Sequence, residues 1–388
     1  MGNNRKTKVI SCFIALTLII TNLLSLNVNA ETQVKRLAGQ GRYETAKAVT
    51  SQWDKSEYAV LVTGSDYPDA LSATPLAKKY DAPILLTEKS KLNSNTLSEI
   101  KRLGVKKVFI VGGPGAVGPQ IENELKKQSI SIERLWGSGR YETSVEVAKK
   151  LENTKEAFIV TGTDFADALT VAPIAAQMKA PIILSPSGNI NNAVKKYLGQ
   201  VSKTYVIGGT KEINEVVYKQ LPSPQRISGA NKYERNINVI NEFVDNKENI
   251  YVATGANYPD ALAGSALAAK NNGYILLVEE NINNTNLNFV KDNKFNTITV
   301  LGGTGVVSET IINIIKTGDY VSDKDNTTES NPTPQLQPEQ PVSNTVYVTS
   351  NGKAYHKNDT CSNMKNPTIM SRTDAISKKY KPCSKCNP

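Results

Sequence analysis

The sequence predicts an α/β protein of three tandem modules, each with a parallel-type sheet between helices, followed by a small C-terminal module. The first observation is a phrase that occurs three times, as TGSDYPDAL from Thr63, TGTDFADAL from Thr161 and TGANYPDAL from Thr254. The copies are 98 and 93 residues apart, which is the length of a small domain. The second observation is that short apolar runs such as AVLV and PILL lack polar alternation, as strands covered on both faces do.

The first copy gives the order of elements that we expect in all three modules. Apolar residues recur at helical spacing in some stretches and form short buried runs in others. We expect helices over 43–53, 68–80, 94–103 and 118–127, and strands over 58–63, 83–87 and 107–111. The repeated phrases divide the chain into modules over residues 31–130, 131–224 and 225–316.

Each TGSDYPDAL-like phrase has the residues of a helix start. In the first copy Asp66 stands at the N-cap position, Pro68 suits the first turn, and Asp69 completes a pair that resembles a capping box. The third copy has Asn257 at the cap position, which keeps a hydrogen-bond acceptor and discards the carboxylate. A catalytic carboxylate pair does not easily accept that change, so the phrase favours helix capping over catalysis.

A glycine-rich stretch, GGPGAVG, follows the strand predicted at 107–111 and contains a G-x-G-x-x-G pattern. This pattern can hold a phosphate or a dinucleotide at a helix N-terminus. The equivalent stretches, IGGTKEIN and LGGTGVVS, lose the pattern, so a glycine turn between a strand and a helix is the simpler interpretation. Backbone amides in such a turn can still contact a phosphate of a polymer, but no nucleotide-dependent enzyme is predicted.

Residues 1–30 have the pattern of an export signal. Three basic residues precede an apolar run over residues 9–26, and small residues end at Ala30. A retained membrane anchor is the alternative, but asparagines interrupt the run where a spanning helix needs about 18 apolar residues. We therefore expect cleavage before Glu31, release to the outside of the cell and no membrane segment afterwards.

Charge and chemistry-bearing residues limit the function classes. The 388 residues have a formal net charge of +10, and loss of the signal leaves +7, which attracts anionic polymers but is also common in soluble proteins. The single histidine is His356 and, apart from Cys12, the cysteines lie between residues 361 and 386. This excludes Ser-His-Asp, Cys-His and His-ligated zinc sites built from residues 31–355 alone.

Four phrases recur in fixed order in the three modules: RLAGQGRYETA, TGSDYPDALSATPLA, PILLT and VFIVGG in the first. They resemble the clostridial cell wall binding repeat 2 family over residues 34–316. The resemblance implies three Toprim-like α/β modules, packed as an intramolecular pseudo-trimer, that bind an anionic secondary cell-wall polymer noncovalently. It also implies an anchoring role for the Ile-Leu-Leu strand. The third copy departs from the family pattern at Lys232 and at residues 273–274.

A cation and a tyrosine begin the first helix of each module, and the aspartate of each DAL phrase recurs in all three. The cation can tie neighbouring elements together, or the cation and tyrosine can bind a phosphate or a sugar at the mouth of the unit. The sequence leaves both interpretations open. The candidate polymer-binding residues are Arg42, Tyr43, Asp69, Arg140, Tyr141, Asp167, Lys232, Tyr233 and Asp260.

Residues 317–343 are expected to form a disordered linker, because they are rich in Pro, Gln, Ser, Thr and Asn and have almost no large apolar residues. The module that follows, residues 344–388, contains a Cys3His set of candidate zinc ligands. Three thiolates and one imidazole make a closed structural zinc site, and Cys-x2-Cys is a usual spacing for two ligands. The ligands would be His356, Cys361, Cys383 and Cys386.

The phrases KAYHKNDTCSNM and KKYKPCSKCNP resemble short extracellular tails that look distantly like the metal-binding domain of the Ada repair protein. A disulfide is the alternative outside the cell. Three cysteines cannot all pair, however, and a disulfide makes no use of His356.

We therefore expect an exported, non-enzymatic cell-surface protein that is anchored to the Gram-positive cell wall and displays the small C-terminal module. A cell-wall-modifying hydrolase is the alternative, because such repeats are often joined to amidase or peptidase domains. A glycosidase that uses two carboxylates on the repeats is formally open. Nucleic-acid binding through the Lys-rich tail is disfavoured, because few aromatic residues accompany the cations.

Overall fold

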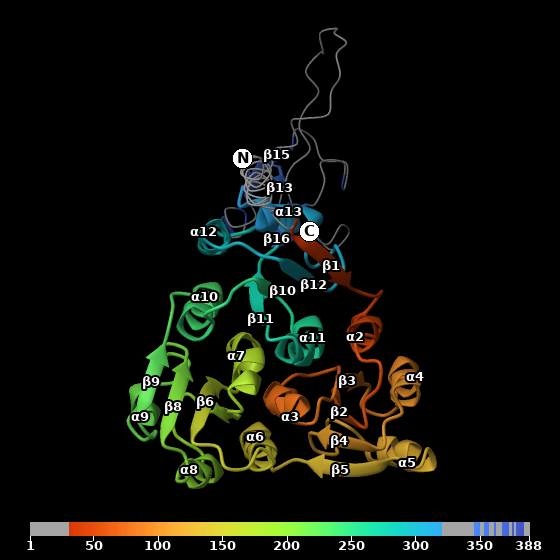
Figure 1. Cartoon of the computed structure of the whole chain (residues 1–388). Coiled ribbons are helices and arrows are strands. Elements are labelled where there is room, and N and C mark those ends of the chain that lie inside the picture. Colours follow the sequence, from red (N-terminus) through yellow and green to blue (C-terminus); the bar gives the residue numbers. More distant parts are fainter. Residues whose placement is uncertain are drawn as a thin grey trace, which may run out of the picture. The chain divides into compact units, whose positions relative to one another are not determined.

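The computed structural model describes residues 31–319, 345–349, 353–356, 361, 367–371, 375 and 378–383 (Figure 1). The chain forms two compact units, divided after Ser322, and each is described by itself. The signal predicted at residues 1–30, most of the linker predicted at 317–343, and Cys386 lie outside the described residues. None of the helices in the described part is long and apolar enough to cross a membrane.

The first module has the predicted alternation of strands and helices. Its strands are β2 (Tyr58–Thr63), β3 (Ile84–Thr87), β4 (Lys107–Val111) and β5 (Ser131–Leu135). All neighbours in the sheet, ordered β3-β2-β4-β5, are parallel. Its helices are α2 (Arg42–Thr50), α3 (Ala73–Lys79), α4 (Ser94–Leu103) and α5 (Pro119–Lys127). Two of the helices predicted here are shorter than expected, since α2 ends at Thr50 and a 3-10 turn, Ala70–Ser72, precedes α3.

The second and third modules repeat this architecture. The strands of the second are β6 (Glu156–Thr161), β7 (Ile182–Ser185), β8 (Lys203–Ile207) and β9 (Pro224–Ile227), and its helices are α6 (Arg140–Lys149), α7 (Ala166–Gln177), α8 (Asn192–Leu198) and α9 (Glu215–Tyr218). The strands of the third are β10 (Asn249–Thr254), β11 (Tyr274–Val278) and β12 (Thr297–Leu301), and its helices are α10 (Lys232–Phe243), α11 (Pro259–Lys270), α12 (Asn284–Asp292) and α13 (Glu309–Thr317). The prediction of three α/β modules with parallel sheets is confirmed.

The fourth strand of each sheet comes from the start of another repeat. Strands β5 and β9 open the second and third repeats, yet they pair with β4 and β8 of the preceding module. The third sheet is completed by β1 (Gln33–Leu37), which pairs with β12 in parallel, from Gln33 opposite Thr297 to Leu37 opposite Leu301. The first strand of the described chain therefore completes the last sheet, and the three modules form a closed ring (Figure 1).

Local patterns in the sequence do not predict these fourth strands. In each of them a buried residue occurs only at the C-terminal end, as Leu37, Leu135 or Ile227, while the preceding residues are exposed or half-buried. A search for buried apolar runs therefore overlooks them, whereas the strands at the opposite edges, β3, β7 and β11, are buried along their whole length.

An arginine on each fourth strand fixes that strand to the sheet it completes. The Nη1 group donates to the carbonyl of the first glycine of the Gly-Gly turn at 2.8 to 3.0 Å. The same guanidinium forms an ion pair, at 2.6 to 3.0 Å, with a glutamate of the helix that follows this Gly-Gly turn. The three sets are Arg36 with Gly302 and Glu309, Arg134 with Gly112 and Glu122, and Arg226 with Gly208 and Glu215.

Helices α3, α7 and α11 meet at the centre of the ring, where each contacts the other two (Figure 1). Almost every residue of α7 and α11 is buried, and their many alanines let the helices approach closely. A Cβ at Gly264 would lie 2.2 Å from a methyl group of Leu301, so this position requires glycine. The hydroxyl oxygens of Thr74 and Ser265, 2.7 Å apart, join α3 to α11.

Three aromatic side chains of the repeated phrases, Tyr67, Phe165 and Tyr258, pack against one another between the modules, with ring centroids 5.4 to 6.0 Å apart. The Tyr67 hydroxyl donates to the carbonyl of Thr163 in the second module at 3.0 Å. The Tyr258 hydroxyl donates to the carbonyl of Gly64 in the first module at 2.9 Å. The aromatic position of the phrase therefore holds the modules together.

The capping-box prediction is wrong for the first and third phrases, whereas in the second the Asp164 side chain accepts the N–H of Ala166, the first residue of α7, at 2.9 Å. The side chains of Asp66 and Asn257 each accept the N–H of the following residue, Tyr67 and Tyr258, rather than an N–H inside the helix. The residue before the first turn makes no side-chain cap in any of the three copies. The second aspartate of each phrase is directed instead toward a glycine turn of its own module, as described below.

In its described residues the second unit has two small sheets. Strand β13 (Thr345–Val348) is antiparallel to β15 (Thr368–Ser371), and β14 (Ala354–Tyr355) is parallel to β16 (Lys381–Pro382). The buried apolar residues of this part are few, namely Val346, Val348, Tyr355 and Ala375.

Ring closure predicts a long-range effect of a change in β1. Leu37 is 5% exposed and packs in the main core, so Leu37→Ala should lower the free energy of unfolding by about 2–4 kcal/mol. Hydrogen exchange should accelerate in β12 and β10 of the third module before it changes in β2 and β4. Val34→Ala, at a position 44% exposed on the same strand, is the control and should have almost no effect. Faster exchange confined to the first module would contradict ring closure.

Candidate functional site

Three equivalent junctions lie where one module meets the next. Each combines the DAL phrase of one module, the glycine turn after its β4, β8 or β12, and the loop that opens the next repeat. Junction 1 joins modules 1 and 2, junction 2 joins modules 2 and 3, and junction 3 joins modules 3 and 1. Because each fourth strand is fixed to the preceding sheet, the loop that follows it is held over the junction.

The aspartate of each DAL phrase lies against the first glycine of its own Gly-Gly turn. These glycines have φ angles of 105 to 123°, a backbone conformation that other residues rarely adopt. A Cβ on the glycine would lie 2.5 to 3.5 Å from the aspartate Oδ2 atom. The pairs are Asp69 with Gly112, Asp167 with Gly208 and Asp260 with Gly302. The recurrence of the first glycine is therefore explained by close packing and backbone geometry, without a nucleotide.

Junction 1 is an open pocket of about 530 Å³. Asp69 of the first module and Arg140 of the second both line it, together with Asp66 and Lys89. The pocket also contains Trp136, which is 48% exposed. A Cβ on Gly113 would lie 3.0 Å from the indole, so the glycine lets Trp136 rest against the turn. An exposed tryptophan beside both acidic and basic groups suits a ligand with a flat apolar face and several hydroxyl groups.

Junction 3 is a second open pocket, of about 390 Å³, with the corresponding wall residues. Asp260 of the third module and Arg42 of the first line it, and Asn257 and Thr45 lie beside them. Burial raises the pKa of the Asp260 carboxyl, while a hydrogen bond from Thr45 and the charge of Arg42 oppose the shift. Where junction 1 has Trp136, the loop of junction 3 has Ala38.

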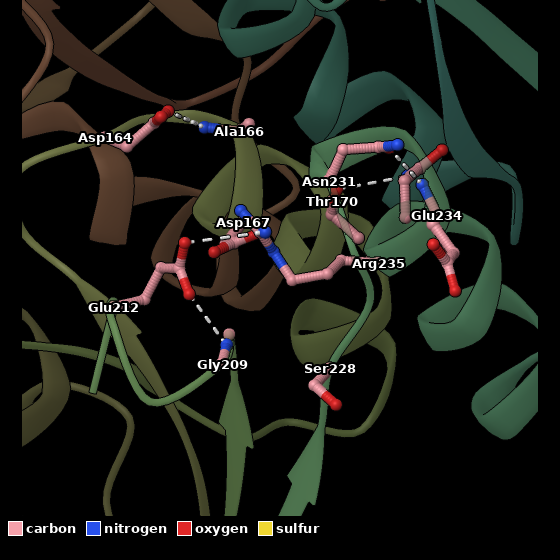
Figure 2. Close-up of polar contacts among 12 residues, drawn as sticks. Asp164, Ala166, Asp167, Thr170, Gly209, Glu212, Ser228, Asn231, Glu234 and Arg235 are labelled. Carbon is pink, nitrogen blue, oxygen red and sulfur yellow. Dashed lines mark hydrogen bonds and ion pairs between the residues drawn. The ribbon is translucent and has the colours of Figure 1, made fainter. Parts of the chain in front are cut away.

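Junction 2 is closed by a side chain of the third module (Figure 2). The Arg235 Nε atom lies 2.8 Å from Asp167 Oδ1, and its Nη1 atom lies 3.6 Å from Glu212 Oε1. The side chains of Arg235 and Asp167 are only 8% and 1% exposed. Glu212 in turn accepts the N–H of Gly209 at 2.8 Å, which holds it over the turn. The ion pair thus occupies the place that is open in the other two junctions.

The charges of junction 2 depend on one another. Burial raises the pKa of the Asp167 carboxyl despite the opposing effect of the Arg235 guanidinium, and the carboxylate raises the pKa of Arg235 against its own burial. Asp167 Oδ2 is buried without a hydrogen-bond partner. Removal of the arginine would therefore leave a buried acid with no compensating charge.

Two substitutions distinguish the closed junction from the open ones. Arg235 stands where the other repeats have Thr45 and Thr143, and Glu212 stands where they have Ala116 and Val306. Lys232 and residues 273–274 are the departures of the third repeat expected from the family pattern, and Arg235 is not among them. The aligned phrases KYER and RYET show that an arginine replaces a threonine in the third repeat. Only the fold shows that this arginine, Arg235, meets Glu212.

The structure separates the sequence-predicted binding residues into three groups. Arg42 with Asp260, and Arg140 with Asp69, line the two open pockets from adjacent modules. Asp167 lies in the closed junction. The third group, Tyr43, Tyr141, Lys232 and Tyr233, is absent from the linings of the two open pockets.

The cation and tyrosine at each helix start also have a structural role. Arg42, Arg140 and Lys232 donate to the carbonyl of the glycine that ends the first buried strand of their own module. The next residue in each module is a tyrosine whose ring packs against the same glycine. A Cβ on the glycine would lie only 2.5 to 2.8 Å from the tyrosine Cε1 atom. These pairs are Tyr43 with Gly64, Tyr141 with Gly162 and Tyr233 with Gly255. Both interpretations left open by the sequence therefore have support for Arg42 and Arg140, which tie two elements together and also line a pocket.

The fold and its junctions define a class of protein: a closed ring of three α/β repeats with open polar pockets between modules and no thiol or imidazole in residues 31–355. The open polar pockets favour ligand binding. The chain belongs to the Cell wall binding domain 2 (CWB2) family, which matches residues 36–122, 134–218 and 226–312. The resemblance drawn from the repeated phrases is confirmed for the three repeats, while the likeness of the C-terminal module to Ada-type tails stays a prediction.

Individual proteins support the same assignment. The chain is 38% identical to N-acetylmuramoyl-L-alanine amidase LytC of Bacillus subtilis (strain 168), a match that covers 79% of this chain and 61% of that protein. It is 31% identical to the amidase enhancer of the same strain, with 74% and 41% covered. It also resembles the structure of Cwp6 from Clostridium difficile with a TM-score of 0.71 and 29% identity, covering 74% of this chain and 48% of that one. The chain spans about two fifths to three fifths of these proteins.

The closed junction leads to a stability prediction. Arg235→Ala should lower the free energy of unfolding by about 3–5 kcal/mol, because it leaves the buried Asp167 without its partner. Adding Asp167→Asn should restore part of that loss, so a urea-denaturation double-mutant cycle should give a coupling energy above about 1 kcal/mol. Lys211→Ala, an exposed cation next to Glu212, is the control for the removal of a positive charge near the junction and should have almost no effect. Additive effects of Arg235→Ala and Asp167→Asn would show that the pair does not stabilise the fold.

Proposed function

We propose that this chain is an exported, non-enzymatic protein of the cell surface that binds an anionic secondary polymer of the Gram-positive cell wall through junctions 1 and 3. The observation that carries the proposal is that two of three equivalent junctions are open pockets, each with an arginine from one module and a DAL aspartate from another. In this proposal the modules are Toprim-like and act together as an intramolecular pseudo-trimer, as the family resemblance implies.

The chemistry of the pockets suits an acidic saccharide. Arg42 and Arg140 can pair with a phosphate or carboxylate of the polymer, because guanidinium groups bind such oxygens in a bidentate way. The carboxylates of Asp69 and Asp260 can accept hydrogen bonds from sugar hydroxyl groups. The exposed indole of Trp136 can stack on the apolar face of a sugar ring in junction 1. Each pocket thus combines one group for the charge of the polymer with another for its hydroxyl groups.

Family membership supports a location at the wall, and the absence of thiols and imidazoles from residues 31–355 supports binding rather than catalysis. The similarity to an amidase and to an amidase enhancer favours a second candidate, a protein that takes part in wall hydrolysis. The match covers only part of each of these relatives, so this candidate needs its own test. Wall lysis measured as loss of turbidity, with the chain alone and with an added amidase, would separate the two candidates.

Sedimentation with purified walls tests the binding proposal. The protein should pellet with intact walls and lose most of its binding after hydrofluoric acid removes phosphodiester-linked polymers. Because the attraction is partly ionic, added salt should also weaken binding. Binding that survives the extraction unchanged would exclude an anionic polymer linked in this way.

A single substitution tests which junction contributes. Trp136→Ala should weaken binding to intact walls by about tenfold or more, because truncation of a tryptophan at the centre of a contact commonly costs about 2 kcal/mol. Val216→Ala is a matched control, since Val216 is 55% exposed and lies outside the linings of junctions 1 and 3. Equal affinities for Trp136→Ala and the unchanged protein would remove junction 1 from the proposal.

A further inference from the structure

Three side chains of the second unit come together although they are distant in the sequence. The ligand atoms of His356, Cys361 and Cys383 all lie within 4.8 Å of one another. His356 and Cys383 are each only 8% exposed, and Cys361 is half-buried. Among the described residues this is the only group of three or more His, Cys, Asp or Glu side chains with such a geometry.

The separation of the two sulfur atoms distinguishes between a disulfide and a metal site. Cys361 Sγ and Cys383 Sγ are 3.8 Å apart, whereas a disulfide bond is about 2.05 Å long. Two thiolates that bind one zinc ion at about 2.3 Å in a tetrahedral arrangement are about 3.8 Å apart. The observed distance is too long for a disulfide and matches two corners of a zinc tetrahedron, and the imidazole of His356 within 4.8 Å of both sulfur atoms favours a metal over two thiols in simple contact.

The backbone places these ligands through a short parallel ladder. In the pairing of β14 with β16, Tyr355 lies opposite Pro382, so the next residues, His356 and Cys383, emerge side by side. The N–H of Cys383 donates to the carbonyl of Tyr355 at 3.0 Å. His356 exchanges two backbone hydrogen bonds with Tyr347, at 2.8 and 2.9 Å, and these fix it to β13. Two ligands are thus positioned by main-chain contacts that do not involve the metal.

The small core of this unit supplies a physical reason for a metal. The buried apolar residues in its described part are Val346, Val348, Tyr355 and Ala375, and a module as short as residues 344–388 rarely buries enough apolar surface to offset the entropy of folding. Small domains of this kind are usually held by disulfides or by a bound metal. Metal binding then contributes directly to the free energy of folding.

We propose that His356, Cys361 and Cys383 bind a structural zinc ion in the C-terminal unit. Thiolate and imidazole donors favour zinc over calcium or magnesium, which prefer oxygen ligands. The sequence supplies Cys386, which lies outside the described residues, as the expected fourth ligand three positions after Cys383. With Cys386 as the fourth ligand, as the sequence predicts, the site would leave no position for a reactive water, and the ion would stabilise the unit rather than catalyse a reaction.

Metal analysis of the purified full chain tests this site, with Cys12→Ser as the background because Cys12 is the only cysteine elsewhere. The protein should contain one zinc ion per chain, and Cys361→Ser and Cys383→Ser should each reduce the content at least fivefold. Lys381→Ala, an exposed neighbour two residues before Cys383, is the control and should keep the ion. Zinc that persists in both cysteine variants would overturn the proposal.

A second measurement does not depend on how well the variants fold. Cobalt added to the chelated background protein should give the intense thiolate-to-cobalt absorption of a tetrahedral site, and zinc should displace it. Mass spectrometry after alkylation should find the thiols reduced under the same conditions. A metal content near zero together with a disulfide between Cys361 and Cys383 would overturn the proposal. Wall sedimentation should be unchanged in every variant, because the site lies outside the repeats. A negative result for zinc can therefore be distinguished from a negative result for polymer binding.

Discussion

The pairing of each fourth strand with the sheet of another repeat is the constraint on which the three-module unit depends. One continuous segment, such as 131–145, completes one sheet as β5 and then begins the next module as α6. No module has a complete sheet of its own, because β1 is needed by β12 and β5 by β4. The orientation between modules is thus determined by backbone hydrogen bonds and by the hydrogen bonds from Arg36, Arg134 and Arg226 to the glycine turns. The junction pockets are consequently preformed, which reduces the entropic cost of ligand binding.

The three junctions share one backbone design but differ in side chains. Glycine turns, aspartates and helix starts recur at each, and the differences are concentrated at positions 116, 212 and 306 and at positions 45, 143 and 235. Where small side chains or threonine occur, a pocket is open; where Glu212 and Arg235 occur together, an ion pair fills it. A buried ion pair contributes little net stability relative to apolar packing, yet it is costly to break. The second junction has therefore become part of the framework, while the other two retain exposed polar groups.

Much of this fold follows from local patterns in the sequence. The strands β2, β3 and β4 coincide with apolar runs, and α4 and α5 coincide with amphipathic periodicity, because burial leaves a strong signal. The strands β1, β5 and β9 leave almost none, since their role is set by partners that are distant in the chain. The aromatic contact of Tyr67 with Phe165 and Tyr258 was likewise outside the reach of local reasoning. The repeated aspartates were found, but whether each faces a pocket or a guanidinium depends on a residue of another module.

Ring closure also limits how the number of repeats can change. In an open solenoid a further copy can be added at either end, since each repeat contacts only its neighbours. Here the last sheet already uses β1, and α3, α7 and α11 each touch both of the others. An additional copy would have to break the β1–β12 ladder and separate three helices that are in mutual contact. Duplication within a gene can therefore lengthen this protein by whole rings or by new tails, but hardly by a single module.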